Sequence, residues 1–482
     1  MATVSDSPTT KPRTFLGLPL TAYLITGFTA FDALAFYGMQ TLLVYYVYFS
    51  QDEGGIGLPT DTAIGIVSAF GATTFLATIF GGWLADRVLG SGRALRYGAF
   101  LAVVGYGVLA LLPGPLGVAI GLVALTLAAS SLWVSEGALM DGALQRFESK
   151  REAGFTVYYL GSAAGAVVGI TFGGILQTEF GFRIGFLASA ISILIGLAVY
   201  LPARRSIEAT APSRQGNLVR GWRLAWPILA ATAAITTLVA VVAVGFNPSL
   251  VITIGASAFA ITAFTRYLRS PRFTPSERRN VLHYLPFNIA TLFFALLYQQ
   301  LFTSVAVHSE SATDRFVFGV EIPPSTVLGF APLCTVVVAP LLAAIWGRLG
   351  DRQPALSTKF AVAFGVCALA IGLFAASAGL SPVTPLLILV LVVVAFGASD
   401  VVISPSGISL AAEVAPPGHE SRLLSLHYVS VSIGIALAGV IAQWYTPGQS
   451  EGLYFGGLAL MAAAVALGMV IARVRLGRRI VA

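Results

Sequence analysis

The stretch GFTAFDALAFYGMQTLLVYY, residues 27–46, decides the fold class of this chain. It lies inside an apolar run long enough to cross a bilayer, since a transmembrane helix needs about 20 mostly apolar residues. The run nevertheless carries Asp32, and an ionisable group at that depth costs about 2.5–3.5 kcal/mol even on insertion scales. Contacts with other polar groups must offset this cost. We therefore expect a helix that forms one wall of a polar site inside a bundle, with Asp32 turned away from lipid.

The composition of the whole chain places it among polytopic membrane proteins. Its 482 residues are 57% hydrophobic and only 10% charged, and the mean hydropathy is +0.85, which excludes a soluble globular core. We predict an all-α protein with fourteen membrane spans, near 16–48, 60–87, 94–113, 117–143, 152–177, 183–202, 225–244, 248–268, 279–307, 322–348, 357–379, 383–412, 420–444 and 452–475.

The distribution of basic residues predicts the topology. With the N-terminus in the cytoplasm, only Arg183 and Arg315 of the 28 lysines and arginines fall on outer segments, as the positive-inside rule requires. Lys11 and Arg13 precede an apolar run that is too long for a cleavable signal peptide. We therefore expect a plasma-membrane protein with both termini in the cytoplasm. The net charge of +7 then reflects topology, and no nucleic-acid partner is expected.

Two related phrases indicate an internal repeat. GGWLADRVLGSGRALRY (81–97) ends the second span, and IWGRLGDRQPALSTKF (345–360) ends the second span of a later block. Internal repeats of this kind are typical of secondary transporters. We predict two pseudo-symmetric six-helix bundles with 12 core helices, joined by a linker and an inserted hairpin that packs outside the bundle. The expected segments are a cytoplasmic tail (1–14), the N-terminal bundle (15–202), a cytoplasmic linker (203–224), the hairpin (225–268) and the C-terminal bundle (279–476).

The repeated turn carries Gly81, Asp86 and Arg87 in its first copy and Asp351 and Arg352 in its second. A short carboxylate beside a basic residue can hold a loop against a helix end through hydrogen bonds and charge. We favour this structural or gating role over direct contact with a substrate.

These residues resemble a known family. GGWLADRVLG is similar to the second-helix motif of the proton-dependent oligopeptide transporters, a branch of the major facilitator superfamily. FTVYYLGSAAG (155–165) is similar to the fifth-helix signature of that family. FFALLYQQ (293–300), EIPPSTVLGFAPL (321–333), RLGDRQP (348–354) and DVVISPSGIS (400–409) resemble its later motifs in order and spacing. The resemblance covers nearly the whole chain and implies the major facilitator fold and peptide transport.

The departures from the family fall on its charged positions. The first-helix pattern E-x-x-E-R-F-x-Y-Y-G loses one Glu and the Arg and shortens the other Glu to Asp32. The fourth-helix Lys falls on Val134, with Glu136 two residues later. The tenth-helix Glu, which in the family receives the amino end of the peptide, is matched by Asp400, and His427 stands where an aromatic residue usually lines the cavity.

The predicted spans hold three acids at mid-membrane depth, Asp32, Glu136 and Asp400, and no lysine or arginine. Three acids without basic partners cannot all stay ionised there, because desolvation and mutual repulsion disfavour the charged form. We therefore expect Asp32 or Glu136 to carry protons and Asp400 to bind substrate. In the alternative interpretation Asp32 is interhelical glue, and the facing of Glu136 stays open.

Several polar or aromatic residues are further candidates for the wall of the site. Each also has a structural interpretation, since aromatic residues in bundles usually pack. His427 is either a pH-sensitive contact or a hydrogen-bonded core imidazole. His308 is expected at the outer edge, exposed. The substrate-binding candidates besides Asp400 are Tyr37, Tyr298, Gln299, Gln300 and His427.

The sequence contains no P-loop and no metal-ligand spacing, so we expect neither an enzyme nor a cofactor. Our first hypothesis is a monomeric symporter that moves small peptides or amine-bearing, peptide-like compounds with protons. One alternative is a proton antiporter that exports cationic amphiphiles. Another is a membrane sensor or scaffold that does not transport.

Overall fold

The computed structural model describes residues 14–210, 247–270, 273–416 and 420–476, and helices dominate these ranges. Thirteen helices in the described ranges are long and apolar enough to cross a membrane. The predicted span 225–244, which would be the fourteenth, lies outside the described residues.

Fifteen helices are assigned within the described ranges. They are α1 (Leu20–Tyr48), α2 (Thr60–Leu84), α3 (Ser91–Leu111), α4 (Pro115–Leu144), α5 (Arg151–Phe180), α6 (Phe182–Thr210), α8 (Pro248–Arg269), α9 (Pro275–Gln299), α10 (Ser304–Ser311), α11 (Pro324–Val327), α12 (Phe330–Leu349), α13 (Leu356–Leu380), α14 (Leu386–Glu413), α15 (Glu420–Ile441) and α16 (Glu451–Leu476). Three two-stranded ladders join β1 (Thr14–Phe15) to β2 (Leu18–Pro19), β3 (Thr313–Asp314) to β6 (Thr384–Pro385), and β4 (Phe316–Val317) to β5 (Val320–Glu321).

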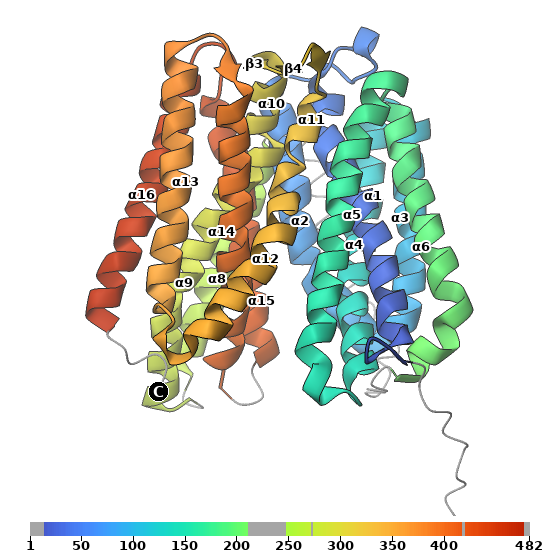
Figure 1. Cartoon of the computed structure of the whole chain (residues 1–482), viewed down its shortest axis with the longest axis vertical. Helices are drawn as coiled ribbons and strands as arrows, with labels where there is room; N and C mark the ends of the chain where they lie inside the picture. Colours follow the sequence, from blue (N-terminus) through green and yellow to red (C-terminus); the bar gives the residue numbers. More distant parts are fainter. Residues whose placement is uncertain (1–13, 211–246, 271–272, 417–419, 477–482) are drawn as a thin grey trace, which may run out of the picture.

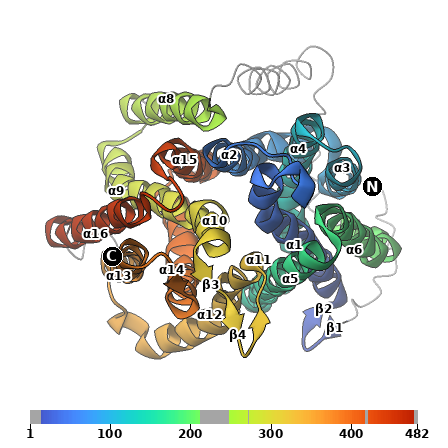
Figure 2. The same ribbon diagram turned by 90° about the horizontal axis from the view of Figure 1, so that it is seen from above.

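Two helical bundles lie side by side (Figure 1). Helices α1 to α6 form one half and α9 to α16 the other. The seam between the halves is made by α2 against α15 and by α5 against α11 and α12. Seen from above, α8 lies outside the two bundles, next to α15 and α2 (Figure 2). This arrangement matches the predicted all-α architecture with two halves and an insert.

Three predicted segments contain detail that the sequence did not indicate. The span predicted over 279–307 lies in one membrane-capable segment, but within it α9 ends at Gln299 and a short turn, Gln300–Phe302, precedes α10. The span predicted over 322–348 likewise contains both α11 and α12. Helix α6 continues to Thr210, into the segment predicted as a linker. An ion pair between Arg96 and Glu208, at 3.3 Å, holds this last part of α6 against α3.

The insert touches both halves of the molecule. Ser249 at the start of α8 donates to the carbonyl of Gly65 on α2, at 2.8 Å. The neighbouring Asn247 donates to the carbonyl of Gly439 on α15, at 3.1 Å. Of the segment predicted as a hairpin, the structure describes α8, which packs on the outside of the seam between α2 and α15.

Close packing of α1 on α5 depends on glycines spaced four residues apart on α5. A Cβ atom on Gly165 would fall on the carbonyl of Ala30, and one on Gly169 would fall on the carbonyl of Leu34. Glycine allows two membrane helices to approach until their backbones touch. These two positions therefore set the distance between α5 and the helix that carries Asp32.

Replacing Gly169 by valine is expected to lower the free energy of unfolding by about 1–3 kcal/mol, because overpacking forces the two backbones apart. Thermal unfolding of the detergent-purified protein measures the change. Gly255→Ala is the matched control, since nothing lies within 4 Å of a Cβ at that position. An unchanged unfolding temperature for Gly169→Val would contradict this account of α1 and α5.

Hydrogen bonds join the two halves at the end of the molecule that carries α10. Tyr45 on α1 donates to the carbonyl of Ala306 at 2.9 Å, and Tyr48 donates to Glu310 at 2.8 Å. The prediction that His308 is exposed is wrong, because its side chain is only 1% exposed. The turn before α10 directs the ring into its own half, where Nδ1 lies 3.1 Å from Glu451 and Nε2 lies 2.9 Å from the Thr384 hydroxyl.

Candidate functional site

A central cavity lies between the two halves. It consists of two adjoining hollows of about 190 and about 70 Å³. Both hollows are lined by Tyr37 from α1, Tyr298 from α9, Phe302 from the turn after α9, and Asp400 from α14. The smaller hollow extends between α5 and α12, and the larger one extends toward α2, α4 and α15. Three of the predicted substrate-binding residues, Asp400, Tyr37 and Tyr298, therefore meet where the hollows adjoin.

Asp400 is held in place by its own helix. Ser404, one turn further along α14, donates its hydroxyl to Asp400 Oδ1 at 2.5 Å. Pro405 lies inside this helix and cannot donate the backbone hydrogen bond that another residue would make there. The turn between Asp400 and Pro405 thus presents polar groups to the cavity, since both Asp400 and Ser404 line the larger hollow.

Asp32 and Glu136 form a buried carboxyl pair beside the cavity. Their side chains are 5% and 1% exposed, and the two carboxyl groups lie close together. Glu136 Oε2 also accepts the hydroxyls of Thr29 at 2.7 Å and Tyr158 at 3.3 Å. Two buried carboxyl groups this close are not readily ionised together, because desolvation and mutual repulsion disfavour the second charge. The pair can therefore hold one proton between α1 and α4.

Two aromatic side chains connect this pair to the cavity. Trp133 lies beside Asp32, and its ring lines the larger hollow. Tyr37 lies close enough to interact electrostatically with both Asp400 and Asp32. A change of charge at Asp32 therefore alters the electrostatic environment of Tyr37 in the wall of the cavity.

The remaining wall candidates separate into two groups. Gln299 lines the larger hollow. Gln300 lines neither hollow, because its amide is bonded within the C-terminal half to Leu296, Ser304 and Tyr454.

His427 also lines neither hollow. Its Nδ1 lies 2.9 Å from the hydroxyl of Tyr284, which donates to Asn288, and Asn288 in turn donates to Ser430 at 2.7 Å. Of the two interpretations left open by the sequence, this geometry favours the hydrogen-bonded core imidazole.

The repeated turn lies away from the cavity. Gly81 packs so closely on α4 that a Cβ would fall on the carbonyl of Ser130. Asp86 and Arg87 follow in a wide helical turn, Ala85–Leu89, with exposed side chains. Asp351 and Arg352 lie in the corresponding turn after α12, and the side chain of Arg352 is exposed. This placement suits a structural or gating role.

No lysine or arginine lines either hollow in the described ranges. Asp400 is accordingly the only acidic or basic side chain among the described residues that line the two hollows. An ammonium group would find a partner here, whereas a carboxylate would find only neutral donors.

Sequence reasoning missed several residues of the site. Gln40 and Trp133 line the larger hollow and Tyr159 lines the smaller one. Tyr159 and the Glu136 partner Tyr158 belong to the quoted phrase FTVYYLGSAAG, which could have indicated them. A lone glutamine or tryptophan in an apolar helix gives no sign of the side it faces.

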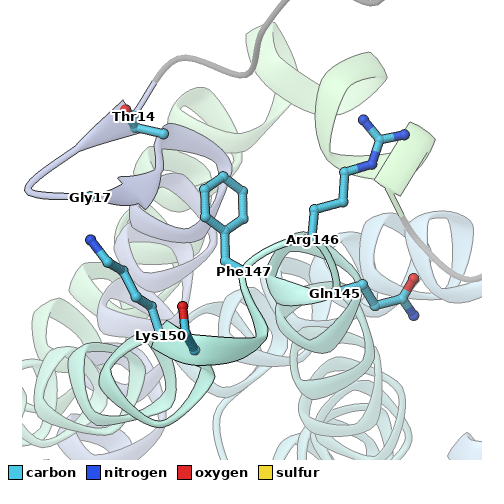
Figure 3. Close-up of a pocket in the computed structure, with 7 residues that line it drawn as sticks. Thr14, Gly17, Gln145, Arg146, Phe147 and Lys150 are labelled. Atoms are coloured by element: carbon cyan, nitrogen blue, oxygen red, sulfur yellow. The ribbon is translucent and has the colours of Figure 1, made fainter.

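A separate hollow opens on the surface between the β1–β2 hairpin and the α4–α5 connection (Figure 3). Lys150 points toward Gly17, whereas Arg146 points away from it, and Phe147 lies between the two basic residues. The hollow shares no lining residue with the central cavity. Because Lys150 and Arg146 point in different directions, these two side chains do not converge on one ligand position.

Comparison with known proteins identifies the family. Residues 97–458 match the model of the POT family. The chain is 27% identical over 447 residues to the di-/tripeptide transporter of Lactococcus lactis subsp. cremoris, covering 88% of this chain and 89% of that protein. It is 26% identical over 454 residues to the uncharacterized transporter YclF of Bacillus subtilis, covering 93% and 92%.

Solved structures of peptide transporters share the fold. The structure of the peptide transporter POT in complex with sulfate superposes with a TM-score of 0.89 at 27% identity, over 97% of each chain. A variant of that transporter in complex with alafosfalin gives 0.88 at 28% identity, again over 97% of each chain. The architecture is therefore the major facilitator fold, and the chain belongs to the POT family of transporters.

Proposed function

We propose that the protein is a secondary active transporter that moves small peptides, or peptide-like compounds bearing an amine, together with protons. The observation that carries this proposal is the cavity between the two halves, in which Asp400 is the charged group and neutral tyrosines form the walls. An ammonium group bound to a partly buried carboxylate gains a charge-assisted hydrogen bond. Relatives named di-/tripeptide transporters support the peptide class of substrate.

Proton coupling is assigned to the pair of Asp32 and Glu136. An intramembrane pair that shares a proton is a suitable carrier if each side of the membrane reaches it in turn. Trp133 and Tyr37 link this pair to the wall of the substrate cavity. Binding of a cation at Asp400 and binding of a proton at the pair can therefore influence each other through short electrostatic contacts.

The two six-helix bundles, 15–202 and 279–476, are proposed to rock about this central site, as in other transporters built from repeats. The hydrogen bonds of Tyr45 and Tyr48 to α10 close the seam at one end. We assign this end to the outside, because the basic residues of the connecting loops gather at the opposite end. Both termini are then cytoplasmic, in the plasma membrane, and the monomer suffices for transport.

Uptake into proteoliposomes tests the proposal. An inside-alkaline pH gradient is expected to drive accumulation of radiolabelled Ala-Ala or its C-terminal amide, and a protonophore is expected to abolish accumulation. Empty liposomes give the background. Uptake that does not respond to the imposed gradient would contradict proton symport.

The aromatic walls of the larger hollow favour one second candidate, export of cationic amphiphiles. Phe36, Phe75, Trp133 and Phe294 line it beside Asp400, and aromatic faces attract cations. In the same vesicles an inside-acidic gradient would then drive a fluorescent cationic amphiphile inward in exchange for protons, and peptides would not compete.

A further inference from the structure

Two glutamines face the cavity with unused hydrogen-bonding atoms. Gln40 on α1 and Gln299 on α9 both line the larger hollow. Their side chains are 4% and 5% exposed. Gln40 Oε1 and Gln299 Nε2 are buried and have no hydrogen-bond partner. Because buried polar atoms in native proteins are nearly always paired, two such atoms in one cavity require an explanation.

The neighbouring Gln300 shows how a structural glutamine differs. Its Nε2 donates to the carbonyl of Leu296 at 3.3 Å, and its Oε1 accepts the hydroxyls of Ser304 at 2.5 Å and Tyr454 at 2.9 Å. Gln300 lies outside both hollows and its amide is satisfied by the protein. Gln299, one residue earlier, turns its amide into the cavity and is not satisfied.

Each of the two amides therefore offers the cavity one acceptor, its oxygen, and one donor group, its NH2. This pair complements an amide group, which offers one N–H and one C=O. A carboxylate offers acceptors alone, so it would leave both amide oxygens unpaired and would meet no cation along the described walls. Exchange of nitrogen and oxygen in either amide leaves this complement unchanged.

We infer that Gln40 and Gln299 bind an uncharged amide of the substrate while Asp400 binds its ammonium group. The preferred substrates are then cationic amino amides, such as C-terminally amidated dipeptides, rather than dipeptides with a free carboxylate. This inference rests on the proposed function, because it specifies the substrate class of the same cavity.

A ladder of four ligands on the purified full-length protein tests the inference. The ligands are Ala-Ala, its C-terminal amide, its N-acetyl form, and the form blocked at both ends, each titrated by thermal stabilisation at fixed pH. We expect the amide to bind at least about tenfold tighter than Ala-Ala, which corresponds to about 1.4 kcal/mol. Both N-acetylated forms are expected to bind more weakly than their free-amine counterparts, because they lack the ammonium group.

The outcomes separate the inference from the function. Equal or tighter binding of Ala-Ala overturns the amide inference and leaves peptide transport standing. Failure of all four ligands to bind contradicts the proposed function, and with it the inference.

Substitution of the glutamines provides the second test. Gln40→Met and Gln299→Met keep the length of the side chain and remove its amide, so each is expected to weaken binding of the dipeptide amide about tenfold and to narrow its advantage over Ala-Ala. Gln443→Met is the matched control, since Gln443 is exposed and bonds only its own turn through Val440. A folded double variant that keeps the preference for the amide would overturn the assignment. The ladder on the unmodified protein decides the question if the variants do not fold.

Discussion

Replacing Asp400 by asparagine is expected to reduce the affinity for amine-bearing substrates by about two orders of magnitude. Removing one partner of a buried, hydrogen-bonded charge pair costs about 2–5 kcal/mol. The asparagine keeps the shape of the side chain and can still accept the Ser404 hydroxyl. The change therefore removes the charge while leaving α14 in place.

Competition for uptake of Ala-Ala amide in proteoliposomes measures this effect. Asp61→Asn is the matched control, because Asp61 is exposed in the first turn of α2 and lies outside the cavity. We expect the Asp400 variant to bind the N-acetylated ligands about as weakly as the unmodified protein does. An affinity for the amine ligands within threefold of the original would remove Asp400 from the binding site.

The helical architecture could be predicted from sequence because hydropathy and loop charge depend on composition alone. The break between α9 and α10 could not be predicted from the sequence. Residues 279–307 read as one apolar run, and the turn at Gln300–Phe302 arises where α10 packs against α1 and the C-terminal half. Only neighbours distant in the chain determine such a turn.

The acids of the site were predictable, whereas their partners were not. Asp32, Glu136 and Asp400 stand out because charge inside a membrane span is rare. The hydrogen bond from Thr29 to Glu136 joins residues 107 positions apart, and no local pattern predicts it.

Side chains with two equally plausible directions were harder to place. His308 near the end of a span was expected in water, but α10 turns it toward Glu451. Gln40 gave no signal at all, since a glutamine in an apolar helix faces a cavity or a neighbouring helix with equal ease.

Uncoupling is the second large effect that we expect. With Asp32→Asn and Glu136→Gln combined, the pair loses both carboxyl groups that we propose share the proton. Side-chain amides can still hydrogen-bond to each other and to Thr29, so the contact between α1 and α4 should persist. Accumulation driven by an inside-alkaline gradient should then fall to the level of simple equilibration.

Exchange of labelled for unlabelled substrate separates coupling from binding. Exchange needs only that the loaded carrier reorients, so the double variant is expected to retain it while losing gradient-driven accumulation. Glu179→Gln, at an exposed position on α5, should retain both activities. If the double variant still concentrates substrate against its gradient in response to pH, the proton must bind elsewhere in the chain. If it loses exchange as well as accumulation while remaining folded, the pair serves substrate binding or reorientation of the carrier, and the division of roles between this pair and Asp400 is wrong.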